Sequence, residues 1–73
     1  MKLRIFVEED NERNEVLSVE QAAKLIGRST PSVYNYLHDK TIKTIRLDKL
    51  YIYKSSFLAA MKNNNIRIKT ELL

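Results

Sequence analysis

Residues 17–38, LSVEQAAKLIGRSTPSVYNYLH, constrain the fold more than any other stretch of this chain. Ser18 and Gln21 stand three positions apart, the spacing of a capping box, in which each side chain accepts a hydrogen bond from the other residue's backbone at a helix start. Apolar residues then recur at helical spacing until Gly27, the residue type that most readily adopts the left-handed conformation of a helix end. The pattern predicts a helix from Ser18 to Gly27.

A second helix start comes at once, with Thr30 as the cap and Pro31 at the first helical position. One arc of this helix is apolar and faces inward: Val33, Tyr36 and Leu37. The opposite arc carries hydroxyl, amide, phenol and imidazole groups and no carboxylate: Thr30, Pro31, Tyr34, Asn35 and His38. Two short helices joined by a tight turn form a helix-turn-helix unit, and a polar face without carboxylates suits the floor of a DNA groove.

The composition excludes several classes of protein. The 73 residues include no cysteine and one histidine, so neither a disulfide framework nor a cysteine- or histidine-based metal site is expected. No apolar run approaches the ~20 residues of a membrane span, which predicts a cytoplasmic protein without membrane contact. The sequence has no nucleophile–base pair and no glycine-rich phosphate loop. We therefore expect no enzyme activity, no catalytic residue, no cofactor and no small-molecule ligand.

Charge is unevenly distributed along the chain. Residues 1–20 carry three basic and six acidic side chains, whereas residues 21–73 carry ten basic and three acidic ones. The basic part coincides with the two helices and the C-terminal half of the chain, as expected for a surface that binds phosphates. A merely solvated, lysine-rich surface is the alternative interpretation.

The flanking segments predict further elements. Alternation at residues 2–7 predicts a strand, and the acidic run at residues 8–15 predicts a mobile loop rather than a metal site. Residues 44–47 and 50–53 predict two short strands about Asp48 and Lys49. A helix is expected from Ser55, as its cap, through residue 62, with three asparagines to stop it. Residues 66–69 alternate again, and could pair with residues 2–7 of the same chain or of a partner.

With LSVEQAAKLIGRSTPSVYNYL at 17–37 and IRLDKLYIYKSSFLAAM at 45–61, the chain resembles the excisionase-like and MerR-like winged-helix DNA-binding domains. The resemblance implies an α+β fold, a small winged helix-turn-helix of three helices and a two-stranded wing, here with an extra N-terminal strand and a possible C-terminal strand. It divides the chain into an N-terminal strand and acidic loop (1–16), the winged helix-turn-helix (17–62) and a tail that is a possible strand or oligomerisation arm (63–73). The family commonly has glycine before Ile42 and in the wing turn, where this chain has Lys40-Thr41 and Asp48-Lys49.

The resemblance also implies how DNA is bound, with the second helix in the major groove and the wing on the flanking backbone or minor groove. The residues it assigns to DNA are Arg28, Ser29, Thr30, Ser32, Tyr34, Asn35, His38, Arg46 and Lys49. Among them, the Asn35 amide could pair with adenine, and hydroxyls at the helix start suit phosphates. Packing under the wing is the alternative for Tyr34, and an exposed residue stabilised by the helix dipole is the alternative for His38. The other three tyrosines are expected in the core or beneath the wing.

These features predict a sequence-specific, nucleoid-associated protein that binds double-stranded DNA. The resemblance implies a role in a phage, plasmid or other mobile element, as an excisionase-like architectural factor or a small transcriptional regulator. One such domain makes a small interface, so we expect a homodimer or a cooperative oligomer on DNA. The alternative is a protein-interaction module that uses the same scaffold to bind a host or phage protein, and the acidic run at residues 8–15 favours it.

Overall fold

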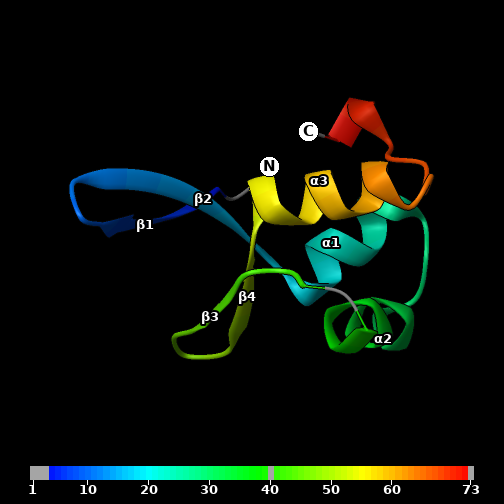
Figure 1. Cartoon of the computed structure of the whole chain (residues 1–73). Coiled ribbons are helices and arrows are strands. Elements are labelled where there is room, and N and C mark those ends of the chain that lie inside the picture. Colours follow the sequence, from blue (N-terminus) through cyan, green and yellow to red (C-terminus); the bar gives the residue numbers. More distant parts are fainter. Residues whose placement is uncertain (1–3, 40, 73) are drawn as a thin grey trace.

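The computed structural model describes residues 4–39 and 41–72. Figure 1 shows three helices packed at one end of a twisted sheet, with two hairpins projecting from them. The elements in chain order are β1 (Ile5–Glu9), β2 (Glu12–Ser18), α1 (Val19–Ile26), α2 (Thr30–Asp39), β3 (Thr44–Arg46), β4 (Leu50–Tyr53), α3 (Lys54–Asn63) and a 3₁₀ turn, η1 (Thr70–Leu72). The α+β winged helix-turn-helix predicted from the sequence is confirmed.

The four strands form one antiparallel sheet in the order β1-β2-β4-β3. The wing is the β3–β4 hairpin, in which Ile45 lies opposite Tyr51. On its other edge β4 pairs with β2, where Leu17 lies opposite Ile52. The wing is therefore anchored to the N-terminal strands as well as to the helices, which matters because an isolated two-stranded hairpin is marginal in water.

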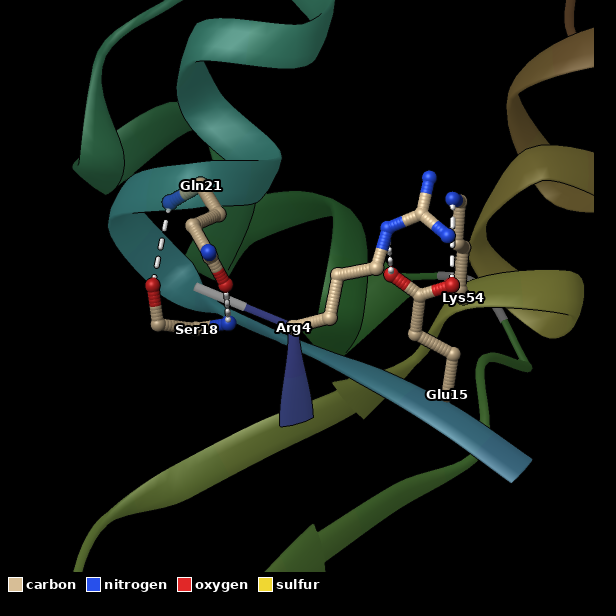
Figure 2. A network of polar contacts seen from close by, with 5 residues as sticks. All are labelled: Arg4, Glu15, Ser18, Gln21 and Lys54. Carbon is tan, nitrogen blue, oxygen red and sulfur yellow. Dashed lines mark hydrogen bonds and ion pairs between the residues drawn. The ribbon is translucent and has the colours of Figure 1, made fainter. Parts of the chain in front are cut away.

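The prediction of a mobile loop at residues 8–15 is wrong. This segment completes β1 and forms most of β2, and the two strands are joined by a two-residue turn at Asp10 and Asn11. Both turn residues have positive φ, 50° and 67°, which Asp and Asn tolerate better than most residues and which matches the twist of a hairpin. On β2, the Glu15 carboxylate lies 3.3 Å from Lys54 Nζ and 4.0 Å from Arg4 Nε (Figure 2). Turn chemistry and these ion pairs outweigh the high charge of the run.

The main core lies where α1 packs between α2 and α3 and against one face of the sheet (Figure 1). At the α1–α2 crossing the side chains of Ala22 and Val33 are completely buried, and Phe57 of α3 packs into the same cluster. The small side chain of Ala22 allows the two helix backbones to approach closely. The predicted inward arc of the second helix is confirmed in part, because Val33 is fully buried whereas Tyr36 and Leu37 are half-buried.

A second, smaller cluster lies on the opposite face of the sheet. Successive residues of β4 alternate between the two faces, so Leu50 and Ile52 join the main core while Tyr51 and Tyr53 join Val16. Lys43 and Lys49 cover this cluster, with Nζ 4.6 Å and 5.8 Å from the ring centres of Tyr53 and Tyr51. Both tyrosines are thus buried supports of the wing, as predicted.

The helix ends agree with the sequence at α1 but not at α3. The Gln21 N–H donates to Ser18 Oγ (3.1 Å) and the Ser18 N–H donates to Gln21 Oε1 (2.9 Å), a complete capping box (Figure 2). The third helix begins two residues earlier than expected, with Tyr53 in place of Ser55 as its cap and without a side-chain hydrogen bond. Ser55 is therefore not the cap, because β4 runs directly into the helix.

Residues 66–69 do not form the strand that their alternating pattern suggests. The half-buried side chains of Ile66 and Ile68 pack against the main core. The Lys69 N–H donates to the Leu25 carbonyl at 2.7 Å, which fastens the tail to the end of α1. An alternating apolar pattern suits an extended segment lying on helices as well as it suits a strand, and here Asn65, with φ of 58°, turns the chain back onto α1.

Candidate nucleic-acid interface

The turn between α1 and α2 sets the position of the second helix. Gly27 has φ of 65°, in the left-handed region, and its N–H is directed to the carbonyls of Ala23 and Lys24. The Arg28 N–H also donates to the Ala23 carbonyl, at 3.0 Å. These bonds satisfy the last carbonyls of α1 and reverse the chain within three residues. The second helix can then begin at Thr30 and cross α1 over its small alanines.

The outer face of α2 is open to solvent. The Tyr34 side chain is 51% exposed, which contradicts the alternative that it packs under the wing, and Asn35 and His38 on the same face are exposed as well. All nine residues assigned to DNA from the sequence are exposed or half-buried, and so are accessible to a ligand: Arg28, Ser29, Thr30, Ser32, Tyr34, Asn35, His38, Arg46 and Lys49.

The start of α2 is suited to an anion. The Oγ atoms of Ser29 and Ser32 lie 3.1 Å apart, and the first turn contains no acidic residue. Free N–H groups and the positive end of the helix dipole are found at this end of any helix. Just before it, the Arg28 guanidinium lies 5.9 Å from the ring centre of Tyr36. Hydroxyl groups and backbone N–H groups thus lie together at the start of α2, and the residue that carries the guanidinium comes directly before them.

The wing and α2 project on the same side of the molecule, away from α3 and the C-terminal tail (Figure 1). Arg46 lies opposite Leu50 in the wing. Leu50 packs on the main core, so Arg46 is on the face of the wing that is turned towards the helices. The wing turn comes directly after it, closed by the Leu47 N–H donating to the Lys49 carbonyl at 2.9 Å. Arg46 is therefore an exposed cation on a wing that projects on the same side as α2.

Lys49 is placed differently from Arg46. Its Nζ lies 3.9 Å from the Glu20 carboxylate and near the Tyr51 ring, on the other face of the sheet. Both charged side chains are more than half exposed, so the ion pair is weak and screened by salt. The pKa of the Tyr51 phenol is raised above its ordinary value, mainly by burial and next by a hydrogen bond to Asp48. The tyrosine is accordingly neutral beneath Lys49 at physiological pH.

Lys69 adds a cation that the sequence did not assign to this surface. Its Nζ and Cε lie so close to Gly27 that a Cβ there would meet them at 3.3 Å and 3.0 Å. The ammonium group is therefore beside the turn that precedes α2. No local pattern marks Lys69 for this position, because it depends on the tail folding back along α1.

Acidic side chains are concentrated elsewhere in the fold. Five of the nine acidic residues of the chain lie at positions 8–15, in the β1–β2 hairpin, which projects away from α2 (Figure 1). On α2 itself, Asp39 at the C-terminal end is the one carboxylate. The fold thus separates the acidic part of the chain from the face formed by α2 and Arg46.

The residues that the structure describes contain neither a candidate metal site nor a candidate membrane span. No group of three or more histidine, aspartate or glutamate side chains among them is arranged to hold a metal ion. In the same residues no helix is both long and apolar enough to cross a membrane.

Comparison with known proteins gives one match. The profile of a family described as a helix-turn-helix domain matches residues 16–65, from the last part of β2 to the second residue after α3. No curated protein and no solved structure matches the chain. The matched region contains α1, α2, the wing and α3, and leaves out most of the β1–β2 hairpin and the tail.

Proposed function

The chain belongs to the helix-turn-helix domain family, as an excisionase-like DNA-binding domain, and we propose that it binds double-stranded DNA sequence-specifically. In this proposal α2 enters the major groove, and the wing lies on the flanking backbone or in the minor groove. One observation carries it: α2 and the wing project on the same side of the molecule (Figure 1), and the outer face of α2 and Arg46 of the wing are exposed. A helix fits the width of the major groove, and a neighbouring hairpin then meets the backbone beside it.

The proposed roles rest on side-chain chemistry. The Asn35 amide offers a donor and an acceptor, which suits the N6 and N7 groups of adenine. Tyr34 contacts a thymine methyl group or a phosphate, and His38 contacts the backbone at the far end of α2. At the helix start the bound groups are phosphates, held by hydroxyl oxygens, backbone N–H groups and cations; the residues are Arg28, Ser29, Thr30, Ser32 and Lys69. From the wing, Arg46 contacts phosphate directly, whereas Lys49 must first leave Glu20.

The biological role that we propose is that of an excisionase-like architectural factor or a small transcriptional regulator of a phage, plasmid or other mobile element, associated with the nucleoid. A single module of this size makes a small interface with DNA, so two or more copies are needed for tight specific binding. A homodimer, or copies that bind cooperatively at neighbouring sites on DNA, would supply the additional copy.

The experiment is a selection of bound duplexes from a random DNA pool, carried out at low and at high salt. Recovery of a sequence motif, with affinity that falls steeply as salt rises, supports the proposal. Binding without a motif would leave only an architectural role. Absence of binding at low salt would contradict the proposal and favour the protein-interaction module, which the projecting acidic hairpin could serve. A variant with Arg28 and Arg46 both changed to Ala, run in parallel, separates binding through the proposed face from binding elsewhere.

A further inference from the structure

β1 is an edge strand with one row of backbone groups unpaired by the sheet. It bonds to β2 on one side, and no strand among the described residues lies on the other. The two-residue turn is flanked by Glu9 and Glu12, and such a turn is closed by a hydrogen-bonded pair. Pairs alternate along an antiparallel ladder, so Ile5, Val7 and Glu9 bond inward to β2. The N–H and C=O groups of the even-numbered residues Phe6 and Glu8 therefore point outward.

The side chains along this edge are self-complementary. When β1 is placed antiparallel to a second β1 about a two-fold axis at Phe6, Phe6 faces its own copy and Ile5 faces Val7. In the same register Arg4 faces Glu8. Opposite charges and apolar pairs directly across a ladder each stabilise the pairing. We propose that two copies of this chain associate through β1, forming a continuous eight-stranded antiparallel sheet with two-fold symmetry.

The competing two-fold register is much poorer. An axis at Val7 would place Phe6 opposite Glu8 and Ile5 opposite Glu9, so that both large apolar side chains would face carboxylates. The register centred on Phe6 also brings the outward N–H and C=O groups of Phe6 directly opposite those of its copy. Outward-facing, even-numbered residues meet one another in both registers, so the backbone can form hydrogen bonds in either, and side-chain chemistry selects the register centred on Phe6.

Pairing through β1 also covers apolar surface on both faces of the sheet. On the helix-facing side, the Phe6 side chain is 39% exposed and the Arg13 guanidinium lies 4.1 Å from its ring centre. On the other side, Ile5 and Val7 flank the cluster around Val16, and the pairing would join this cluster to that of the second copy. In a closed two-fold contact the β1 edges of both copies are paired, so no further strand can add to them.

The opposite edge of the sheet is less suited to this contact. β3 has three residues, against five in β1. It also carries Arg46, and a second copy paired there would cover the surface proposed for DNA. Association through β1 rests on the homodimer included in the proposed function. Because it is tested without DNA, its failure can be distinguished from a failure of DNA binding.

Charge reversal gives the test. In Arg4→Glu, position 4 would face Glu8 of the copy with like charge, and in Glu8→Arg two arginines would face each other. Mixing the two variants makes both facing pairs opposite in charge. Sedimentation velocity should show a dimer for the unchanged protein, at least tenfold weaker association for each variant alone, and a heterodimer when the two are mixed. Formation of the heterodimer shows in addition that both variants are folded.

Matched controls are Arg67→Glu and Glu12→Arg, which make the same charge changes at exposed positions away from the β1 edge. Both should dimerise like the unchanged protein. A monomer at about 1 mM, the weak limit of specific association, would overturn the proposal. So would a dimer that neither β1 variant weakens, since the contact would then lie elsewhere. Measured DNA affinity of the monomeric variants for a single site reports on the proposed function independently.

Discussion

Asn35 presents its amide from the exposed face of α2, next to Tyr34 and one helical turn from Pro31. Because one amide can bond two atoms of an adenine edge, Asn35→Ala should weaken binding to the selected site by about 1–3 kcal/mol. Binding to unrelated sequences, which depends on phosphate contacts, should change little. Fluorescence anisotropy with the selected duplex and a scrambled duplex measures the difference. The fold should be intact, because the side chain is exposed.

Asn63→Ala is the matched control for Asn35→Ala. Asn63 is exposed at the end of α3, and α3 and α2 lie on opposite sides of α1 (Figure 1). Its replacement should leave both affinities unchanged. Equal loss on the selected and scrambled duplexes with Asn35→Ala would mean that this residue contacts the backbone and does not read a base.

Arg46 and Lys49 stand close together in the sequence, yet they differ in what they contact. Arg46 is exposed, with no ion-pair partner among the described residues, whereas Lys49 lies 3.9 Å from Glu20. Arg46→Ala should weaken binding to every sequence and lower the slope of log K against log salt by ~1, the effect of one lost phosphate contact. Lys49→Ala should have a smaller effect, because the free protein already pairs this cation. Titrations at several salt concentrations give both slopes.

Lys62→Ala, at an exposed position near the end of α3, is the control for the wing variants, and its slope should equal that of the unchanged protein. If Arg46→Ala, Lys49→Ala and Asn35→Ala all bound DNA with unchanged affinity, neither α2 nor the wing would be part of the interface.

Among the elements, α1 has the better-formed start and α3 the poorer one. The Ser18 capping box has both of its hydrogen bonds, so Ser18→Ala should lower the free energy of unfolding by about 1 kcal/mol. Ser55 looks like a cap in the sequence but lies inside α3, behind Tyr53. Ser55→Ala should therefore change stability by no more than about 0.5 kcal/mol, as for an ordinary surface position. Urea denaturation monitored by circular dichroism measures both, and the opposite ranking would place the helix starts differently.

The packing of α2 on α1 depends on Val33 more than on Leu37. Val33 is 0% exposed, whereas Leu37 is half-buried. Val33→Ala leaves a cavity at the crossing and should cost about 1–3 kcal/mol, enough to unfold much of a small domain. Leu37→Ala removes more atoms, but the site can relax into solvent and should lose less per methylene group. Thermal and urea unfolding of the two variants would reveal a reversed order, and with it a different face of α2 turned inward.

The elements that could be predicted from the sequence are those with local signals. A capping box, a glycine with positive φ and a proline at a helix start define α1 and α2 within a few residues. The β1–β2 hairpin was missed because its charged run outweighed a turn signal, Asp10-Asn11, that is weaker than one containing glycine. The tail was missed because its placement depends on a hydrogen bond to Leu25, far away in the sequence. Lys69 was therefore absent from the expected site, while the other residues of α2 and the wing could be assigned from helical spacing and the resemblance.

At the scale of the whole molecule, the fold separates the two proposed functions along the chain. Residues 16–65 carry the family match and the surface proposed for DNA. The β1–β2 hairpin, largely outside that match, carries five acidic residues and the edge proposed for self-association. A negative hairpin is repelled by phosphates, which keeps this edge away from the DNA and available to a second copy. The same charges, once two hairpins are paired through Arg4 and Glu8, lie between two DNA-binding faces.

The symmetry of that contact predicts the arrangement of the DNA sites. Two copies related by a two-fold axis at Phe6 present their α2 helices in opposite directions, so the selected DNA should contain an inverted repeat, with half-sites ~10 bp apart or a multiple of that spacing. Cooperative neighbours without this axis would select direct repeats. Arg4→Glu should lose the preference for a paired site over a single half-site while keeping its affinity for the half-site. Selection with the unchanged protein and with Arg4→Glu, read side by side, measures this; direct repeats recovered by both would show that copies align on DNA through a surface other than β1.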